Sequence, residues 1–175
     1  IITESRNLKI FEYLQSETDL ILSDLEKIYF KEFSNFEKEK FLPLFFLSQI
    51  LDEFSLKNLK FSKSEISKIR LLRKWNLFLK IKTIYELNEI ERFDLHQELE
   101  TILPAFILFL PKSFHMDWLA RWRDKDDKLF HPSDLMKGEV VKKYLKIQDG
   151  PILGKLINYL SRELAFNRLN NFDEA

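Results

Sequence analysis

Apolar side chains recur along most of this chain at the three- and four-residue spacing of an α-helix, and no segment has the strict alternation of a half-buried strand. The clearest helix begins at Ser62-Lys-Ser-Glu65, a capping box in which a hydroxyl and a carboxylate each pair with a free backbone N–H. From there to about residue 80, the apolar side chains fall on one side of the helix: Leu71, Leu72, Trp75, Phe78 and Leu79. The pattern predicts an all-α protein, an irregular multi-helix bundle.

The same signals predict further helices in the first 130 residues. Asp94 and Gln97 have the spacing of an N-terminal cap for a helix that runs toward Leu110. Pro104 should kink or interrupt that helix, because proline cannot donate its backbone hydrogen bond. We expect the remaining helices at about 5–15, 18–32, 37–54, 83–92 and 114–123.

Proline and glycine break the chain into shorter pieces after residue 130, at Pro132, Gly138, Gly150 and Pro151. We therefore divide the chain into a helical body, residues 1–130, and a small C-terminal helical tail subdomain, residues 131–175. The tail is too small to fold well without packing on the body. Its expected helices lie at 133–137, 139–146 and 151–165, and Asn170 or Asn171 could cap a last turn.

Composition supports a helical core and argues against a membrane protein. The longest apolar runs, 41–51 and 101–110, are shorter than the roughly 20 residues that span a bilayer, so we expect buried core helices there. The chain has no cysteine, which excludes disulfides and thiolate zinc sites and fits a reducing compartment such as the cytoplasm. It begins at Ile1 rather than Met, so we expect it to be a fragment.

The formal net charge is zero, but the charges are segregated along the chain. Residues 1–54 hold 6 basic and 11 acidic side chains, residues 55–82 hold 9 basic and one acidic, and residues 83–104 hold one arginine and six acids. On the helix over 63–80, the side opposite the apolar one carries Lys63, Arg70, Arg73 and Lys74. A basic strip on a neutral protein suggests a polyanion partner, although a solvated surface explains the pattern equally well.

The three glycines exclude the common nucleotide-binding loops. The chain has no G-x-G and no Gly-Ser pair. Residues 150–155, GPILGK, fall short of a P-loop, because three residues instead of four separate the glycines and Leu156 stands where the motif needs Ser or Thr. The same glycines match GxxxG, but that helix-dimer motif belongs to long apolar membrane segments.

No arrangement of side chains in the sequence predicts catalysis. Asp124 and Asp126 could form a metal-binding pair, yet they stand between basic residues after a predicted helix, where a solvated loop is the better interpretation. His96, His115 and His131 lie far apart and form no HExxH motif. No serine or cysteine nucleophile has a recognisable setting, so we expect this chain by itself to have no catalytic residue.

The segment around Gly150 predicts a helix N-terminus that could hold a phosphate. Pro151 suits the first helical position, which leaves the N–H groups of Gly150, Ile152 and Leu153 without helical partners at the positive end of the helix dipole. We expect Lys155, Asn158 and Arg162 to face outward. The apolar stripe expected to face the core is Ile152, Leu153, Leu156, Ile157 and Leu160. The alternative is a simple turn, with Gly154 permitting close helix packing.

Trp118 and Trp122 are four residues apart, with Arg121 and Arg123 beside them. Such a pair could stack on exposed bases or cover an RNA end. Core packing is the interpretation that we favour, because large aromatic side chains are usually buried.

The stretch LMKGEVVKKYLKIQDGPILGKLINYL resembles the C-terminal signature of the bacterial CCA-adding tRNA nucleotidyltransferase and poly(A) polymerase family. The match comprises a leucine before Gly138, a short helix that ends near Ile147, then Gly150-Pro151 and Gly154-Lys155-Leu156. Asn170 or Asn171 followed by Asp-Glu-Ala is similar to the end of the family's tail. Upstream, LKFSKSEISKIRLLRKW resembles the helical body of these enzymes.

The resemblance implies a part of an enzyme that holds RNA. In the family, a head carries Gly-Ser and Asp-x-Asp for metal and triphosphate, and a neck carries Glu-Asp-x-x-Arg; this chain has none of these on a plausible scaffold. The body and tail grip the acceptor and T arms of tRNA and so place its 3′ end. The resemblance thus implies a non-catalytic tRNA-binding portion, without a cofactor of its own.

The expected partners are tRNA or another structured RNA and a catalytic head and neck in the same polypeptide, with no membrane. Mg²⁺ and ATP or CTP are expected only at the missing head. The rival hypothesis is a helical protein-interaction or scaffold domain with an incidental basic face. The sequence predicts neither the added nucleotides nor the oligomeric state. The RNA phosphate contacts that we expect are Lys63, Arg70, Arg73, Lys74, Gly150, Ile152, Leu153, Lys155 and Arg162.

Overall fold

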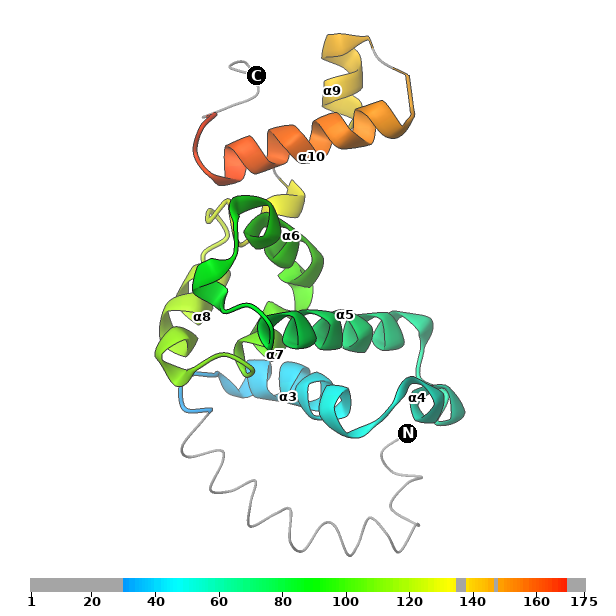
Figure 1. Ribbon diagram of the computed structural model, residues 1–175, viewed down its shortest axis with the longest axis vertical. Helices are drawn as coiled ribbons and strands as arrows, with labels where there is room; N and C mark the ends of the chain where they lie inside the picture. The colour runs from blue at the N-terminus through cyan, green and yellow to red at the C-terminus, as the bar shows by residue number, and fades with distance from the viewer. Residues whose placement is uncertain (1–29, 135–137, 147, 170–175) are drawn as a thin grey trace, which may run out of the picture.

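The computed structural model describes residues 30–134, 138–146 and 148–169, and in these ranges the chain forms helices and no strand (Figure 1). The all-α prediction is therefore confirmed. The helix expected at 5–15, most of the one at 18–32 and the last turn at Asn170 or Asn171 lie outside the described residues. Residues 30–33, the expected end of the second helix, form a bend and a turn instead.

The body is made of α-helices joined by short 3₁₀ turns, and the tail is a pair of helices. The body elements are α3 (Asn35–Ile50), α4 (Glu53–Asn58), α5 (Lys63–Leu79), η1 (Ile84–Glu86), α6 (Glu89–Leu99), η2 (Glu100–Ile102), α7 (Leu103–Ile107), η3 (Lys112–Phe114), α8 (His115–Arg123) and η4 (Pro132–Asp134). The tail elements are α9 (Gly138–Leu145) and α10 (Pro151–Ala165). The expected bounds at 63–80, 114–123, 139–146 and 151–165 are thus confirmed to within one residue.

Three predicted helix bounds are wrong, and caps at other residues explain them. Over 83–92 the chain forms η1 and then, from Glu89, the start of α6. The helix expected over 37–54 ends at Ile50, and Asp52 begins a new helix by accepting a hydrogen bond from the Ser55 N–H at 2.7 Å. Asp94 is not a cap but lies inside α6. The cap of α6 is Asn88, whose side chain accepts from the Glu91 N–H at 2.9 Å while the Glu91 carboxylate accepts from the Asn88 N–H at 2.8 Å.

The body packs around one hydrophobic core to which α3, α5, α6, α7 and α8 all contribute. Every residue of α7 is buried, so the apolar run at 101–110 does lie in the core. Pro104 sits in the first turn of α7 and interrupts the helical run after α6, as expected. Figure 1 shows α3 and α5 side by side, and α7 contacts both of them and also α6.

The body reaches the boundary that we expected near residue 130, and the turn after it packs on both parts of the chain. Leu129 and Phe130 are buried in the body core, and η4 packs against α6 as well as α10. The chain therefore leaves the body after η4. The expected helix at 133–137 is represented by this short 3₁₀ turn, and residues 135–137 lie outside the described ranges.

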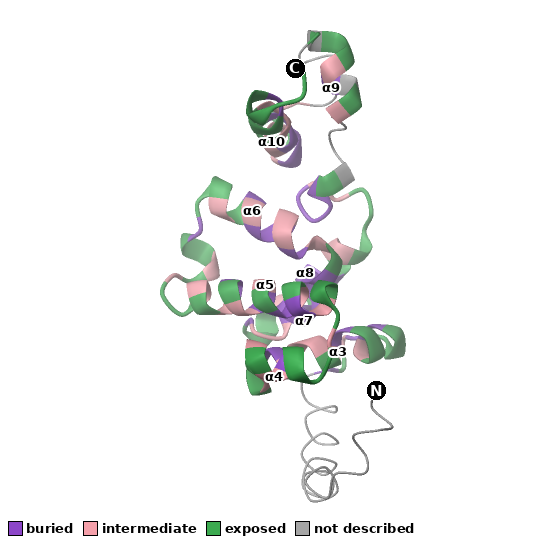
Figure 2. Cartoon of the chain, turned by 90° about the vertical axis from the view of Figure 1, so that its right-hand side faces the viewer, coloured by how far each residue is buried: buried purple, intermediate pink, exposed green. Residues whose placement is uncertain are grey.

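The tail has a small core of its own and is fastened to the body at one end. Val141 of α9 packs with Leu153, Leu160 and Leu164 of α10, and Figure 2 shows the buried positions of α10 gathered on one side of the helix. Beyond α10, Arg168 pairs with Glu89 of α6 and with Glu163. None of the helices within the described ranges is both long and apolar enough to cross a bilayer.

Candidate nucleic-acid interface

Three basic side chains of α5, Arg70, Arg73 and Lys74, already have partners inside the protein. Arg70 pairs with Glu53 at 2.8 Å, and Lys74 pairs with Glu98 at 2.6 Å. Lys63 is exposed and has no ion pair among the described residues. Exposed ion pairs contribute little to stability, so Arg70 and Lys74 could exchange a carboxylate for a phosphate at small cost.

Arg73 has a different role from the one that we expected. Its guanidinium turns toward the C-terminal end of α3, where Nε donates to the Ser48 carbonyl at 2.7 Å and Nη2 to the Leu47 carbonyl at 3.3 Å. The last carbonyls of a helix have no partners within the helix, and a cation there also balances the helix dipole. Arg73 therefore joins α5 to α3 and is not available as a phosphate contact.

Acidic side chains of α6 and of the turn before it lie close to the basic side chains of residues 55–82 and balance much of their charge. Besides the Lys74–Glu98 pair, Lys82 contacts Glu91 at 2.5 Å, and that hydrogen bond holds the pKa of Glu91 below its ordinary value. Asp94 on the same helix has a raised pKa, because burial and the nearby Glu98 charge both disfavour its ionised form. Basic and acidic residues that are separate in the sequence thus lie on neighbouring helices, where they partly neutralise one another.

The start of α10 has the geometry that the sequence predicts. Gly150 is the N-cap in an extended conformation, Pro151 follows as the first helical residue, and the first helical hydrogen bond runs from the Gly154 N–H to the Gly150 carbonyl at 3.3 Å. The N–H groups of Ile152 and Leu153 therefore have no partner within the helix. Gly150, Pro151 and Ile152 are all exposed, so this helix end faces solvent.

The faces of α10 agree with the prediction except at Ile152 and Arg162; the Arg162 side chain, expected to face outward, is only 24% exposed. Leu153 and Leu160 are buried and Leu156 and Ile157 pack against them, but Ile152 is 73% exposed and does not face the core. It lies outward because a helix turns 100° per residue, which places Ile152 on the side of Lys155, Tyr159 and Arg162 rather than on that of Leu153.

The glycines of the tail differ in how much space a Cβ would have at each position. A Cβ at Gly150 or Gly154 would meet nothing within 4 Å, so Gly154 is not needed for close helix packing. A Cβ at Gly138 would lie 3.3 Å from the Ile157 Cδ1 atom, which places the tight contact between α9 and α10 there instead.

The outward face of α10 joins basic and aromatic side chains. Lys155 and Tyr159 are exposed, and the Arg162 guanidinium lies 5.6 Å from the centre of the Tyr159 ring. Asn158 is exposed next to them, as expected. Lys155 has no ion pair among the described residues, and the nearest carboxylate oxygen to Arg162 is that of Glu163 at 3.9 Å.

The two tryptophans are core residues, as favoured from the sequence. Trp118 is 9% exposed and packs against Phe114, Phe130 and His96, so base stacking does not apply to it. Trp122 is half-buried, meets the Phe41 ring edge-on at 5.5 Å and donates its indole N–H to the Glu100 carbonyl at 2.8 Å. One side of Trp122 borders a surface groove.

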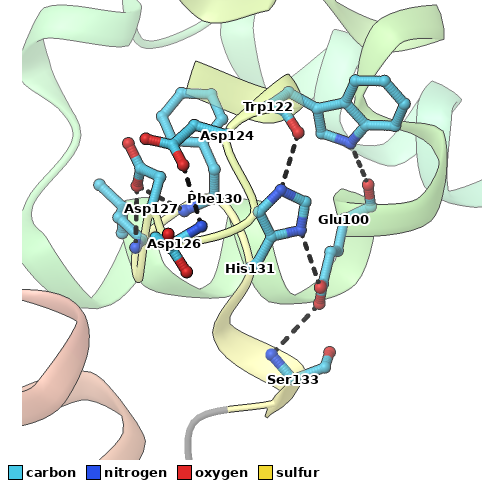
Figure 3. A network of polar contacts seen from close by, with 9 residues as sticks. Glu100, Trp122, Asp124, Asp126, Asp127, Phe130, His131 and Ser133 are labelled. Carbon is cyan, nitrogen blue, oxygen red and sulfur yellow. Dashed lines mark hydrogen bonds and ion pairs between the residues drawn. The ribbon is translucent and has the colours of Figure 1, made fainter. Parts of the chain in front are cut away.

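A polar network that the sequence did not predict surrounds Trp122 (Figure 3). The His131 ring lies between two acceptors, with Nε2 at 2.7 Å from the Trp122 carbonyl and Nδ1 at 3.3 Å from the Glu100 carboxylate. The other Glu100 oxygen accepts from the Ser133 N–H at 3.2 Å. No sequence signal could reveal this network, because its members come from separate segments that only the fold brings together.

The aspartates at 124–127 shape a loop. The Asp126 N–H donates to the Asp124 carboxylate at 3.0 Å, and Asp127 accepts from Arg121 and from the N–H groups of Leu129 and Phe130 (Figure 3). Burial raises the pKa of Asp127, but the hydrogen bonds from Arg121 and from the Phe130 and Leu129 N–H groups together outweigh burial and the pKa is lowered. In the described ranges, no three metal-ligating side chains gather where they could hold an ion.

Comparison with family models, curated proteins and solved structures gave no match. The functional evidence is therefore the geometry of the surface, together with the resemblance at the tail. It brings Lys155, Arg162 and the N–H groups of α10 together on one exposed surface. It leaves the α5 cations on a separate surface of the body.

Proposed function

We propose that this chain is the non-catalytic RNA-binding body and tail of a tRNA nucleotidyltransferase or poly(A) polymerase. In this role it would hold structured RNA so that the 3′ end reaches a catalytic head elsewhere in the same polypeptide. The observation that supports this most is the outward face of α10, where the first N–H groups and Lys155 are exposed and the half-buried Arg162 lies beside them. The same helix contains the stretch that resembles the family.

The contacts on this face suit phosphates rather than base edges. The N–H groups of Ile152 and Leu153 point out of the positive end of the helix, where a phosphate oxygen can accept them. Lys155 and Arg162 are seven residues apart, about 10 Å along the helix axis, so each can meet a different phosphate. Such contacts recognise the shape and charge of an RNA arm, not its sequence.

The exposed cations of α5 would form a second, weaker contact. Lys63 is free for this among the described residues, and Arg70 and Lys74 can exchange their surface carboxylates for phosphate. Catalysis, with its Mg²⁺ and ATP or CTP, would belong to the head. A cytoplasmic location fits both an RNA partner and a chain without cysteine.

Binding of tRNA to the full chain at increasing salt concentration tests the proposal. Affinity should fall steeply with salt, and Lys155→Glu combined with Arg162→Glu should weaken binding at least about tenfold and lower the salt slope by about 2. The matched control is Lys57→Glu with Lys60→Glu, which makes the same charge change at α4, away from α10 (Figure 1). Equal loss in both variants would contradict a specific α10 surface.

The rival hypothesis of a protein-interaction domain has one observation in its favour. Ile81 and Tyr85, just after α5, are 89% and 82% exposed, which is unusual for large apolar side chains. Tight, salt-insensitive binding to a protein, together with no affinity for tRNA, would support this rival and overturn the RNA-binding proposal.

A further inference from the structure

A groove on the body, formed by the start of α3 and the end of α8, lies apart from the outward face of α10. Its volume is about 460 Å³, and its lining includes Phe36, Lys40, Thr101, Trp122 and Lys125. This volume lies in the range of small-molecule sites. The lining combines aromatic rings with cations, which is the combination that binds unpaired nucleotides.

Trp122 is held rigidly on its inner side. Its indole N–H donates to the Glu100 carbonyl at 2.8 Å, its own carbonyl accepts from His131 at 2.7 Å, and the Phe41 ring packs against it edge-on. Figure 3 shows the tryptophan anchored by this network. A ring fixed in this way loses little conformational entropy when a ligand stacks on it.

Phe36 and two lysines complete the outer side of the groove. Phe36 is 66% exposed although it is a large apolar side chain. The Lys40 ammonium lies 5.6 Å from the centre of the Phe36 ring, and the Lys125 ammonium lies 5.2 Å from the Trp122 ring. Neither lysine has an ion pair within the described ranges.

The carboxylates near the groove are already engaged. Glu37 is bound through both oxygens by Arg123, at 2.8 and 2.6 Å, and Glu100 is held by His131 and the Ser133 N–H. Burial raises the pKa of Glu37, but the hydrogen bonds from Arg123 and Ser34 together outweigh burial and the pKa is lowered. Arg123 balances Glu37, and Lys40 and Lys125 outnumber the remaining Glu100 carboxylate, so the groove keeps a positive charge for a ligand.

We propose that this groove binds one unpaired nucleotide of an RNA, with the base stacked on Phe36 or Trp122 and the phosphate between Lys40 and Lys125. A nucleotide presents a flat π-face and an anion in one unit, and the groove offers a partner for each. This inference rests on the proposed function in that RNA is the partner. It assigns a second RNA-binding site, for a single strand, to the body, whereas α10 belongs to the tail.

Binding of fluorescein-labelled hexa-adenylate to the full chain tests this inference. Phe36→Ala should weaken binding about tenfold, because stacking on one aromatic ring supplies that much. Phe36 is exposed, so its loss spares the core. Trp122→Leu should have at least the same effect if the variant folds, and Lys40→Gln with Lys125→Gln should reduce the salt dependence.

The control is Phe54→Ala, which removes another exposed phenylalanine, on α4. Hexa-adenylate binding that Phe36→Ala leaves unchanged, or that Phe54→Ala weakens equally, would overturn the inference. So would poly-glutamate that binds the groove more tightly than hexa-adenylate.

The two proposals fail separately. The Lys155→Glu, Arg162→Glu variant should retain hexa-adenylate binding to within about twofold, because α10 and the groove share no residue. If hexa-adenylate binds through Phe36 but tRNA does not bind, the α10 proposal is wrong and the groove proposal is supported. If tRNA binds through α10 but Phe36→Ala leaves hexa-adenylate binding unchanged, only the groove proposal is wrong.

Discussion

The body and the tail use their polar side chains in opposite ways. In the body, Arg73 and Arg123 donate to backbone carbonyls, and buried histidines lie among aromatic rings. In the tail, Lys155 and the first N–H groups of α10 face solvent without a partner among the described residues. A cation that donates to backbone carbonyls, as Arg73 does, is less available to a ligand than an exposed one, so the density of charge in the sequence is a weaker guide to binding than the cations left without a partner in the structure.

Acid provides the largest test of this contrast, because the buried histidine on which it acts lies in the body. His96 lies in the body core, and burial, with Arg121 and Arg92 nearby, lowers its pKa to about 3. Since the unfolded pKa is near 6.5, the unfolded chain binds a proton between these values and the folded chain does not. The free energy of unfolding should therefore fall by about 1 kcal/mol for each pH unit below 6.5.

Urea unfolding of the wild type and of His96→Phe between about pH 7.5 and 4.5 measures this effect. The phenylalanine keeps a ring between Trp118 and Phe130 and removes the titration, so the variant should lose this part of the slope. The remaining slope belongs to carboxylates such as Asp127, whose lowered pKa also costs stability in acid. Identical slopes in the two proteins would show that His96 titrates normally and that the body core is open to protons.

Arg73→Met provides the second test. Removing the guanidinium leaves the Leu47 and Ser48 carbonyls at the end of α3 without these donors, which should cost about 1–2 kcal/mol of the free energy of unfolding. The affinity of the folded variant for tRNA should stay the same, because Arg73 joins α5 to α3 and does not contact RNA.

The matched control for Arg73→Met is Lys63→Met on the same helix. It removes an exposed cation and should leave the melting temperature nearly unchanged while it weakens tRNA binding slightly. If Arg73→Met weakens tRNA binding and spares stability, the assignment of Arg73 to the fold is wrong.

Gly154→Ala gives the smallest effect and concerns the tail. A Cβ at this position would meet nothing within 4 Å, and alanine favours the helix, so the variant should gain about 0.5–1 kcal/mol of stability. The same change at Gly138 should gain less stability, because its Cβ would lie 3.3 Å from the Ile157 Cδ1 atom and that side chain would have to shift. Thermal unfolding of both variants measures the difference. A loss of tRNA affinity in the stable Gly154→Ala variant would show that RNA approaches the backbone there.

Helices with strong local signals were predicted well, and long-range partners were not. The bounds of α5 and α10 follow from a capping box and from Gly150-Pro151, which act within a few residues. Asp94 was taken for a cap because its spacing fits one, but Asn88 captures the Glu91 N–H earlier in the chain. Where two caps compete, the packing of the helix decides between them.

By itself, the sequence determined that the protein is helical, where α5 and α10 begin, and that the start of α10 would carry free N–H groups, since these properties depend on neighbours within one or two turns. Only the tertiary structure decided which cations remain available. It turned Arg73 toward α3, paired Lys74 with Glu98 and set Trp122 beside Phe36, because these contacts join residues that are close only after the helices pack.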